Sequence, residues 1–385
     1  MIAAAASPSA LGPPEKVEAL RAQRDRRYPF IVRFTDGAAS AERTLGVDPA
    51  ATDAVELTLI NGVAATLNVG AALDLSGRPG IAQVWYLHPD LAPLYVRTIK
   101  ALQHTVETVP LPAVANMSIG PEPRFWTLEP LEDEPMHAAT RASTEAGLVP
   151  VVAIGNNPRA ESMPGWMNPW SWPRWVISVG AYDGQRVADF SARGAPDRPE
   201  TWPDVVAQGV DVVTTYSTGL AKSARRRRRD EESPLFRRAV PREKWDLYTL
   251  ESGTSQAAST VSGAAAQIMH FVKETMARAP STDDGRPLFA LTADPERRRA
   301  AAVADAPRLC GTATVAADGS VTFEYRPATP WKLVKQVLVD TAVPLDGVEP
   351  AAAGAGLVDT DHVKRQFGRF GVIDSKLFAA KVLDG

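Results

Sequence analysis

The stretch that decides the fold is "LESGTSQAASTVSGAAAQIMHF", residues 250–271, where a small polar turn runs directly into an apolar, alanine-rich segment. This pattern predicts a helix that begins near Ser255. A hydroxyl at such a position projects from the helix N-terminus, where free N–H groups and the helix dipole favour developing negative charge. The small neighbours Gly253, Ala257 and Ala258 leave room for a bound peptide backbone.

Two interpretations of Ser255 follow from this segment. Serine is a common N-cap, so the hydroxyl could simply satisfy the first N–H groups of the helix. Alternatively, Ser255 is a nucleophile, which requires that its hydroxyl be exposed, aimed and deprotonated by a nearby base. On this segment alone the capping interpretation is favoured, and the rest of the chain has to decide between them.

The composition is that of a folded globular protein. A chain of 385 residues with 45% hydrophobic and 23% charged residues has room for one large α/β domain or two smaller ones. The net charge of −3 creates no field that would attract nucleic acid or anionic membrane, so we expect neither as a partner. A single cysteine, Cys310, excludes a disulfide framework and favours a cytoplasmic protein. We expect no cofactor and no metal.

The hydrophobic pattern divides the chain into three parts. Residues 1–27 are a polar lead-in, and residues 28–88 carry short strands around an Asn-Gly turn, which predicts a small α+β domain. Over residues 89–385, longer helices alternate with apolar strands, which predicts a parallel sheet with helices on both faces. Insertions at about 217–246 and 277–329 interrupt this rhythm.

The first insertion contains five consecutive arginines, residues 225–229, followed by Asp230, Glu231 and Glu232. Such a run could bind nucleic acid or be a processing site. We favour a solvated loop, because the acidic neighbours weaken any field. The second insertion contains a predicted hairpin, "GTATVAADGSVTFEY", which turns at Asp318-Gly319.

Around Ser255 the sequence resembles the subtilase family of subtilisin-like serine peptidases. In that family the nucleophile lies in a Gly-Thr-Ser-x-Ala motif followed by Val-x-Gly-Ala-Ala, which residues 253–257 and 261–265 match. Three further blocks stand in the family's order: "NMSIGP" (116–121), "VVAIGNN" (151–157) and "DVVAQGVDVVTTY" (204–216), the last with glutamine where the family has proline.

The resemblance implies roles for eight residues. Ser255 would be the nucleophile, and the side chain of Asn156 would help to form the oxyanion hole. The strand that pairs with the substrate backbone would contribute Ser118, Ile119 and Gly120. The other residues implied at the substrate site are Gly155, Gly253 and Thr254.

The upstream part fits the same resemblance. "YPFIVRFTDGA", "LINGVAATLN" and "RPGIAQVWYL" resemble the propeptide, or inhibitor-type, domain that precedes many subtilases. In that family the small α+β domain assists folding and blocks the cleft until it is cut off.

The chain departs from the family in its triad. Blocks like Val-Ile-Asp-x-Gly and His-Gly-Thr-His-Val-Ala-Gly, which carry the aspartate and the histidine, are missing. We therefore expect a parallel sheet truncated at its N-terminal strands, or an edge that the upstream domain or a partner covers. His88 near the junction is the one histidine that could replace the missing base. For His104 and His137, on predicted amphipathic helices, a surface or boundary position is favoured, and for His270 and His362 a structural role is favoured.

Three functional hypotheses remain. The chain is a peptidase acting on a peptide or protein, with its base supplied by His88 or by a partner protein that completes the active site in trans. Alternatively, it is a pseudoprotease scaffold that binds a peptide or partner by β-augmentation along the "NMSIG" segment. A hydrolase acting on a small acyl substrate is the third possibility.

Overall fold

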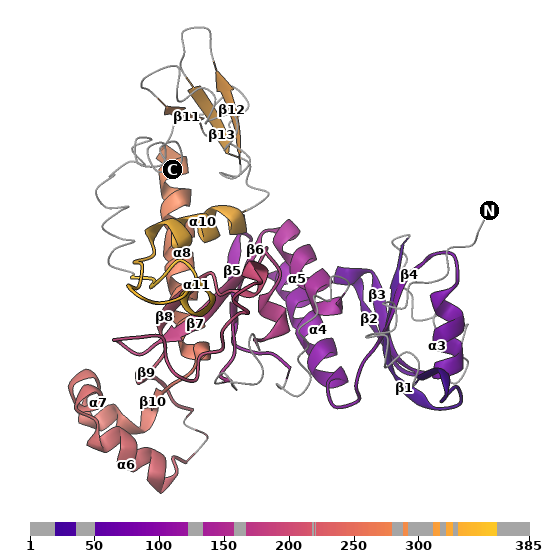
Figure 1. Ribbon diagram of the computed structural model, residues 1–385, viewed down its shortest axis with the longest axis horizontal. Helices are drawn as coiled ribbons and strands as arrows, with labels where there is room; N and C mark the ends of the chain where they lie inside the picture. The colour runs from indigo at the N-terminus through magenta and orange to yellow at the C-terminus, as the bar shows by residue number, and fades with distance from the viewer. Residues whose placement is uncertain are drawn as a thin grey trace. The chain divides into compact units, whose positions relative to one another are not determined.

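The computed structural model describes residues 20–35, 51–121, 134–157, 167–217, 219, 221–278, 288–291, 311–315, 321–325 and 330–359 (Figure 1). Two compact units emerge from the contacts between residues. The first contains residues 1–113 and 129–148, and the second contains residues 114–128 and 149–385. Each unit is described by itself.

The first unit is built on a four-stranded antiparallel sheet with the order β2-β3-β1-β4. The elements of this sheet and its first helix are β1 (Arg27–Phe34), β2 (Thr52–Leu57), the 3-10 helix η1 (Thr58–Ile60), β3 (Gly62–Asn68), α3 (Val69–Ser76) and β4 (Ile81–Tyr86). Alternate residues of β1, namely Phe30, Val32 and Phe34, are buried in one core cluster with residues of α3. The expected turn at Asn61 is confirmed, since this residue adopts φ 50° between η1 and β3.

Two longer helices complete the described part of the first unit, α4 (Ala92–Thr108) and α5 (Pro135–Ala146). They contact each other, and both contact η1. As expected, α5 ends at Gly147, which adopts φ 110°. His137 on α5 is buried, so the expectation of a surface or boundary position for it was wrong. The expected domain boundary near residue 88 stays a prediction.

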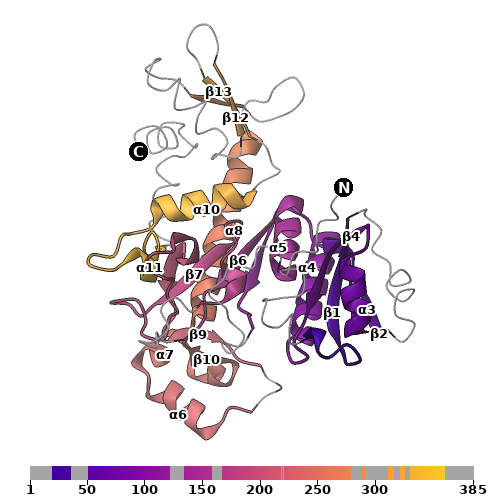
Figure 2. The same cartoon turned by 45° about the vertical axis from the view of Figure 1, so that its right-hand side comes forward.

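The second unit is built on a four-stranded sheet with the order β5-β6-β7-β8, and Figure 2 labels its two central strands, β6 and β7. Its strands are β5 (Ala113–Met117), β6 (Leu148–Ala153), β7 (Ile177–Tyr182) and β8 (Val205–Gln208). The pairs β6–β7 and β7–β8 are parallel. The two central strands are mostly apolar, with β6 buried throughout and β7 buried except at Tyr182, which suits a sheet that is covered on both faces.

Helices cover this sheet, as expected. The helix α8 (Thr254–Arg278) packs on β7 and β8, and α10 (Pro330–Thr341) packs on α8. Together they bury one core of valine, alanine, isoleucine and leucine side chains. A short helix, α11 (Pro350–Ala353), packs against Val206 and Val187 in a second cluster. The predicted α/β fold with a parallel sheet is confirmed.

The second insertion forms a separate antiparallel sheet with the order β11-β13-β12. Its strands are β11 (Leu288–Leu291), β12 (Gly311–Val315) and β13 (Val321–Tyr325). The antiparallel pairing of β12 with β13 confirms the two strands of the predicted hairpin, whose predicted turn at Asp318-Gly319 lies outside the described residues.

The first insertion lies between two antiparallel strands, β9 (Val212–Thr215) and β10 (Tyr248–Glu251). We call residues 216–247 the arm; its described elements are α6 (Ala224–Glu232), α7 (Pro234–Ala239) and the 3-10 helix η5 (Arg242–Leu247). The expectation of a solvated loop was wrong, because the arginine run forms α6. The helix starts at Ser223, whose side chain accepts from the N–H of Arg226.

Among the residues that the structure describes, no helix is both long and apolar enough to cross a membrane. The same residues hold no cluster of histidine, cysteine, aspartate and glutamate side chains suited to a metal ion.

Candidate active site

Ser255 lies in the first turn of α8, at the edge of the second unit where β10 leads into the helix. The helix begins at Thr254, so Gly253 takes the position before the first helical residue and Ser255 lies inside the turn. The interpretation of Ser255 as the N-cap is therefore not supported. Ser255 is half-buried, and its neighbour Thr254 is 1% exposed.

Close backbone contacts fix the turn that precedes Ser255. The N–H of Gly253 donates to the carbonyl of Gly209 over 2.7 Å. A Cβ on Gly209 would lie 2.8 Å from the carbonyl oxygen of Gly253 and 2.7 Å from the Cβ of Ala181. Only glycine at position 209 allows this approach, so the end of β8, the turn and the start of α8 form one tightly packed junction.

Thr254 connects this turn to the end of β6. Its N–H and its hydroxyl both lie within hydrogen-bond distance of Asn156 Oδ1, at 2.7 and 2.9 Å. The N–H of Gly155 donates to the Thr254 hydroxyl over 3.1 Å. Gly155 adopts φ 110°, a region that favours glycine and turns the chain toward Thr254 at the end of the strand.

These bonds determine the orientation of the Asn156 amide. A backbone N–H can only donate, so the atom that faces Thr254 has to be the oxygen of the amide. The NH₂ group then points to the other side, where a Cβ on Gly253 would lie 3.2 Å from Nδ2. The sequence places Asn156 and Ser255 99 residues apart, and the structure brings their segments together through Thr254.

The segment after β5 lies along the same end of α8. The hydroxyl of Ser118 donates to the carbonyl of Ser255 over 3.0 Å. Asn116 Nδ2 donates to the hydroxyl of Ser259, one turn further along the helix, over 3.1 Å. The strand ends at Met117, so the three expected substrate residues, Ser118 to Gly120, follow it as a partly exposed segment.

A buried asparagine, Asn168, holds this segment to β6. Its Nδ2 donates to the carbonyls of Ile119 and Ala153, each over 3.0 Å. A Cβ on Gly120 would lie 2.6 Å from the Asn168 side chain, so glycine is required there. Neither Asn168 nor Asn116 was predicted from the sequence. The only signal was an Asn-Pro dipeptide at 168, which also predicts an ordinary turn.

The histidines divide between the two units. His270 is the only histidine among the described residues of the second unit, and it lies 15 residues after Ser255, about 22 Å along α8. His88 belongs to the first unit, where its Nδ1 accepts from the N–H of Asp90 over 3.2 Å. Its role as a base stays a prediction, and His362 lies outside the described residues.

Comparisons with known proteins identify the family of this chain. The family model described as "Subtilase family" matches residues 96–299, which is more than half of the chain. The chain belongs to the subtilase family. The match contains the segment after β5, the end of β6 and the start of α8, but it begins after the four-stranded sheet of the first unit.

Several solved structures resemble this subtilase. A mutant of the protease domain of PatA has 16% identity and a TM-score of 0.40 over 72% of this chain and 66% of that chain. The patellamide maturation protease PatA has 18% identity and a TM-score of 0.40, covering 70% and 67%. A psychrophilic protease has 22% identity and a TM-score of 0.30, covering 44% and 47%. This subtilase thus spans just under two thirds of the first of them, and no curated protein matches it.

Proposed function

We propose that this subtilase hydrolyses peptide bonds with Ser255 as the nucleophile and Asn156 as an oxyanion donor. The observation that carries the proposal is the fixed Asn156 amide, whose oxygen is held by Thr254 next to Ser255. A donor oriented before the substrate arrives stabilises the oxyanion without further reorganisation. The peptide or protein substrate would lie along the segment Ser118 to Gly120.

The reaction has to proceed through a base. The Ser255 hydroxyl attacks the carbonyl carbon, the base takes its proton, and the same group returns the proton to the leaving amine. Water then cleaves the acyl-enzyme by the reverse route. Because His270 is too far along α8, we propose that the base is His88 of the first unit, or a histidine that a partner protein supplies in trans in the cytoplasm.

We further propose that the four-stranded sheet of the first unit is an inhibitor-type propeptide domain. Its antiparallel sheet with the helix α3 packed on it supports this assignment. We expect this domain to stay attached, because self-processing would need the base that the missing triad blocks would have supplied.

A fluorophosphonate probe tests the proposal on the full-length protein. Ser255 should become labelled, and Ser255→Ala should not. Asn156→Ala should label about 10²- to 10³-fold more slowly, because it removes one oxyanion donor. Asn157→Ala, a change of the same size at the next residue, is the matched control and should label at the wild-type rate. If Ser255 is not labelled either in the protein alone or in the presence of candidate partners, the proposed peptidase activity is excluded.

The alternative is a pseudoprotease that binds a peptide. It is favoured by the lack of any histidine near Ser255 among the described residues of the second unit, and by Ile119, which is 39% exposed. The carbonyl of Ile119 already accepts from Asn168, so an added peptide strand would pair with the other backbone groups of this segment. Peptide binding that persists in Ser255→Ala, with no labelling of the wild type, would select this alternative.

A further inference from the structure

The outer edge of β10 is occupied by side chains of the arm. Antiparallel strands turn the backbone groups of alternate residues toward the partner strand and those of the intervening residues away. The N–H of Tyr216 donates to the carbonyl of Leu247 over 2.7 Å, so Thr249 and Glu251 face β9 in this register. The backbone groups of Tyr248 and Leu250 therefore point away from β9.

Three side chains satisfy these outward groups. Asp230 accepts from the N–H of Leu250 over 3.1 Å, and Arg229 donates to the carbonyl of the same residue. Lys222 donates to the carbonyl of Tyr248. All three lie on α6 or directly before it, so this helix takes the place that a third strand would have beside β10.

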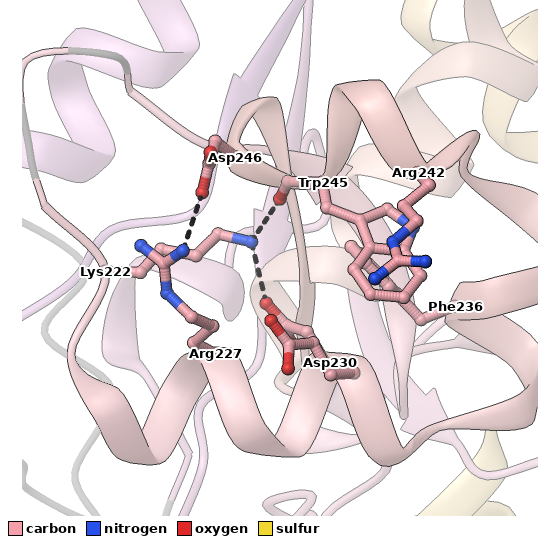
Figure 3. Close-up of a pocket in the computed structure, with 8 residues that line it drawn as sticks. Lys222, Arg227, Asp230, Phe236, Arg242, Trp245 and Asp246 are labelled. Atoms are coloured by element: carbon pink, nitrogen blue, oxygen red, sulfur yellow. Dashed lines mark hydrogen bonds and ion pairs between the residues drawn. The ribbon is translucent and has the colours of Figure 1, made fainter.

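The attachment is anchored by a buried ion pair. The side chains of Lys222 and Asp230 are 4% and 1% exposed, and their charged atoms lie 2.9 Å apart. Figure 3 shows Lys222 reaching across to Asp230 and to the carbonyl of Trp245. All three residues line a pocket of about 200 Å³. Removing one partner of a buried pair leaves an unpaired charge, which is strongly destabilising.

A second contact reaches the last residue of β10. Arg226 on α6 pairs with the carboxylate of Glu251, four residues before Ser255. Beyond Glu251 the chain has little freedom, because the hydroxyl of Ser252 accepts from the N–H of Asp211 over 2.9 Å. The next residue, Gly253, is held by the hydrogen bond from its N–H to the carbonyl of Gly209. Through these contacts, the position of β10 determines the position of the turn before Ser255.

We propose that the arm is a clasp that holds β10 and thereby fixes the turn before Ser255, with Arg226 and Asp230 as positioning residues. The clasp itself is independent of the proposed peptidase activity; only its effect on the reactivity of Ser255 rests on that proposal. The remaining positive charge of α6 faces solvent, as the Arg228–Glu232 pair shows, with side chains 78% and 62% exposed.

Hydrogen exchange on the full chain tests the clasp with neighbouring arginines. Arg226→Gln should speed exchange in peptides covering residues 248–256 at least about 10-fold, whereas Arg228→Gln, two positions away on the same helix, should leave it unchanged. Asp230→Asn should have the larger effect, with Glu232→Gln as its control. Peptides from β7 should keep their protection, which separates a local opening from unfolding.

A conservative variant and a second readout complete the test. Arg226→Lys keeps the charge opposite Glu251 and should restore most of the protection. The fluorophosphonate labelling rate of Ser255 should fall at least about 5-fold in Arg226→Gln and recover in Arg226→Lys. If Arg226→Gln and Asp230→Asn exchange like their controls, the clasp is wrong. Faster exchange with an unchanged labelling rate would refute the positioning role. A wild type that never labels would refute the peptidase proposal, while exchange at residues 252–256 still decides whether the turn is fixed.

Discussion

At the scale of single residues, the hydroxyl of Thr254 connects three parts of the candidate site. It accepts from the N–H of Gly155, lies 2.9 Å from Asn156 Oδ1, and belongs to the first turn of the helix that carries Ser255. A threonine next to Ser255, the proposed nucleophile, thus determines where the amide of Asn156, the proposed oxyanion donor, points.

Replacing this hydroxyl by a methyl group should cost stability as well as orientation. We expect Thr254→Val, which keeps the shape of the side chain, to lower the free energy of unfolding by about 1–3 kcal/mol, because the N–H of Gly155 loses its acceptor. Thr254→Ser keeps the hydroxyl and should lose less. Denaturant unfolding of the two variants checks this, and equal losses would contradict the role given to the hydroxyl.

Asp230 makes part of the stability depend on pH. Burial raises its pKa, but the hydrogen bonds from Lys222, the N–H of Leu250 and Thr249 together hold that pKa below the usual value. A lowered pKa means that the stabilisation is present above about pH 4, the ordinary range of an aspartate, and is lost as the pH falls.

The difference in unfolding free energy between the wild type and Asp230→Asn isolates this effect from other carboxylates. We expect the difference to be constant between about pH 5 and 7 and to shrink below about pH 4. Denaturant unfolding at a series of pH values measures it, and a difference that grows toward low pH would have the wrong sign for a lowered pKa.

The residues of the candidate site that lie in short sequence motifs could be predicted. Ser255 and Asn156 were predicted because each lies in a short pattern at the end of a strand or the start of a helix. Asn168 and Asn116 could not be predicted, because their partners are 49 and 143 residues away and an isolated asparagine has many other uses.

At the scale of elements, two glycines that look alike in the sequence have opposite surroundings. A Cβ on Gly209 would collide with the carbonyl of Gly253, whereas a Cβ on Gly263, on the exposed side of α8, would meet nothing within 4 Å. The junction of β8 with the turn therefore depends on one missing methyl group.

The same substitution at both positions should act in opposite directions. Gly209→Ala should destabilise the protein by about 1–3 kcal/mol through overpacking. Gly263→Ala should stabilise it by about 0.5–1 kcal/mol, because alanine loses less conformational freedom in a helix. Thermal or denaturant unfolding distinguishes them, and a neutral Gly209→Ala would show that the junction can relax.

The elements of the parallel sheet were predictable because buried strands are continuous apolar runs, and the end of α5 was predictable from Gly147. The arginine run was not. Its helix depends on bonds to Glu251 and Leu250, more than twenty residues along the chain, and a charged segment by itself carries no sign of such partners. The helical structure of this segment therefore depends on tertiary contacts, which its composition does not reveal.

At the scale of the whole molecule, the described residues of the second unit place no histidine near Ser255 that could act as its base, and this has a measurable result. We expect the purified protein to keep its intact mass, without a cut between residues 88 and 95, because self-processing needs that base. Intact mass spectrometry checks this. A cut in this interval that disappears in Ser255→Ala would instead reveal an active, self-processing enzyme.

The division into a small antiparallel part and a larger parallel part was also predictable, since alternating strands and continuous strands look different in a sequence. The grouping of α4 and α5 with the small sheet was not, because amphipathic helices carry no sign of which sheet they will cover.

The attachment of the arginine run to β10 also determines how readily trypsin cleaves this protein. Five consecutive arginines would be its preferred target in an extended chain, but a protease needs several residues of unfolded backbone to cut. In the native state α6 withholds that backbone, and two of the five side chains, Arg226 and Arg229, are already bound to β10. The rate at which trypsin cleaves at residues 225–229 therefore reports how often the arm opens. Followed on a gel, this rate measures the local opening next to Ser255.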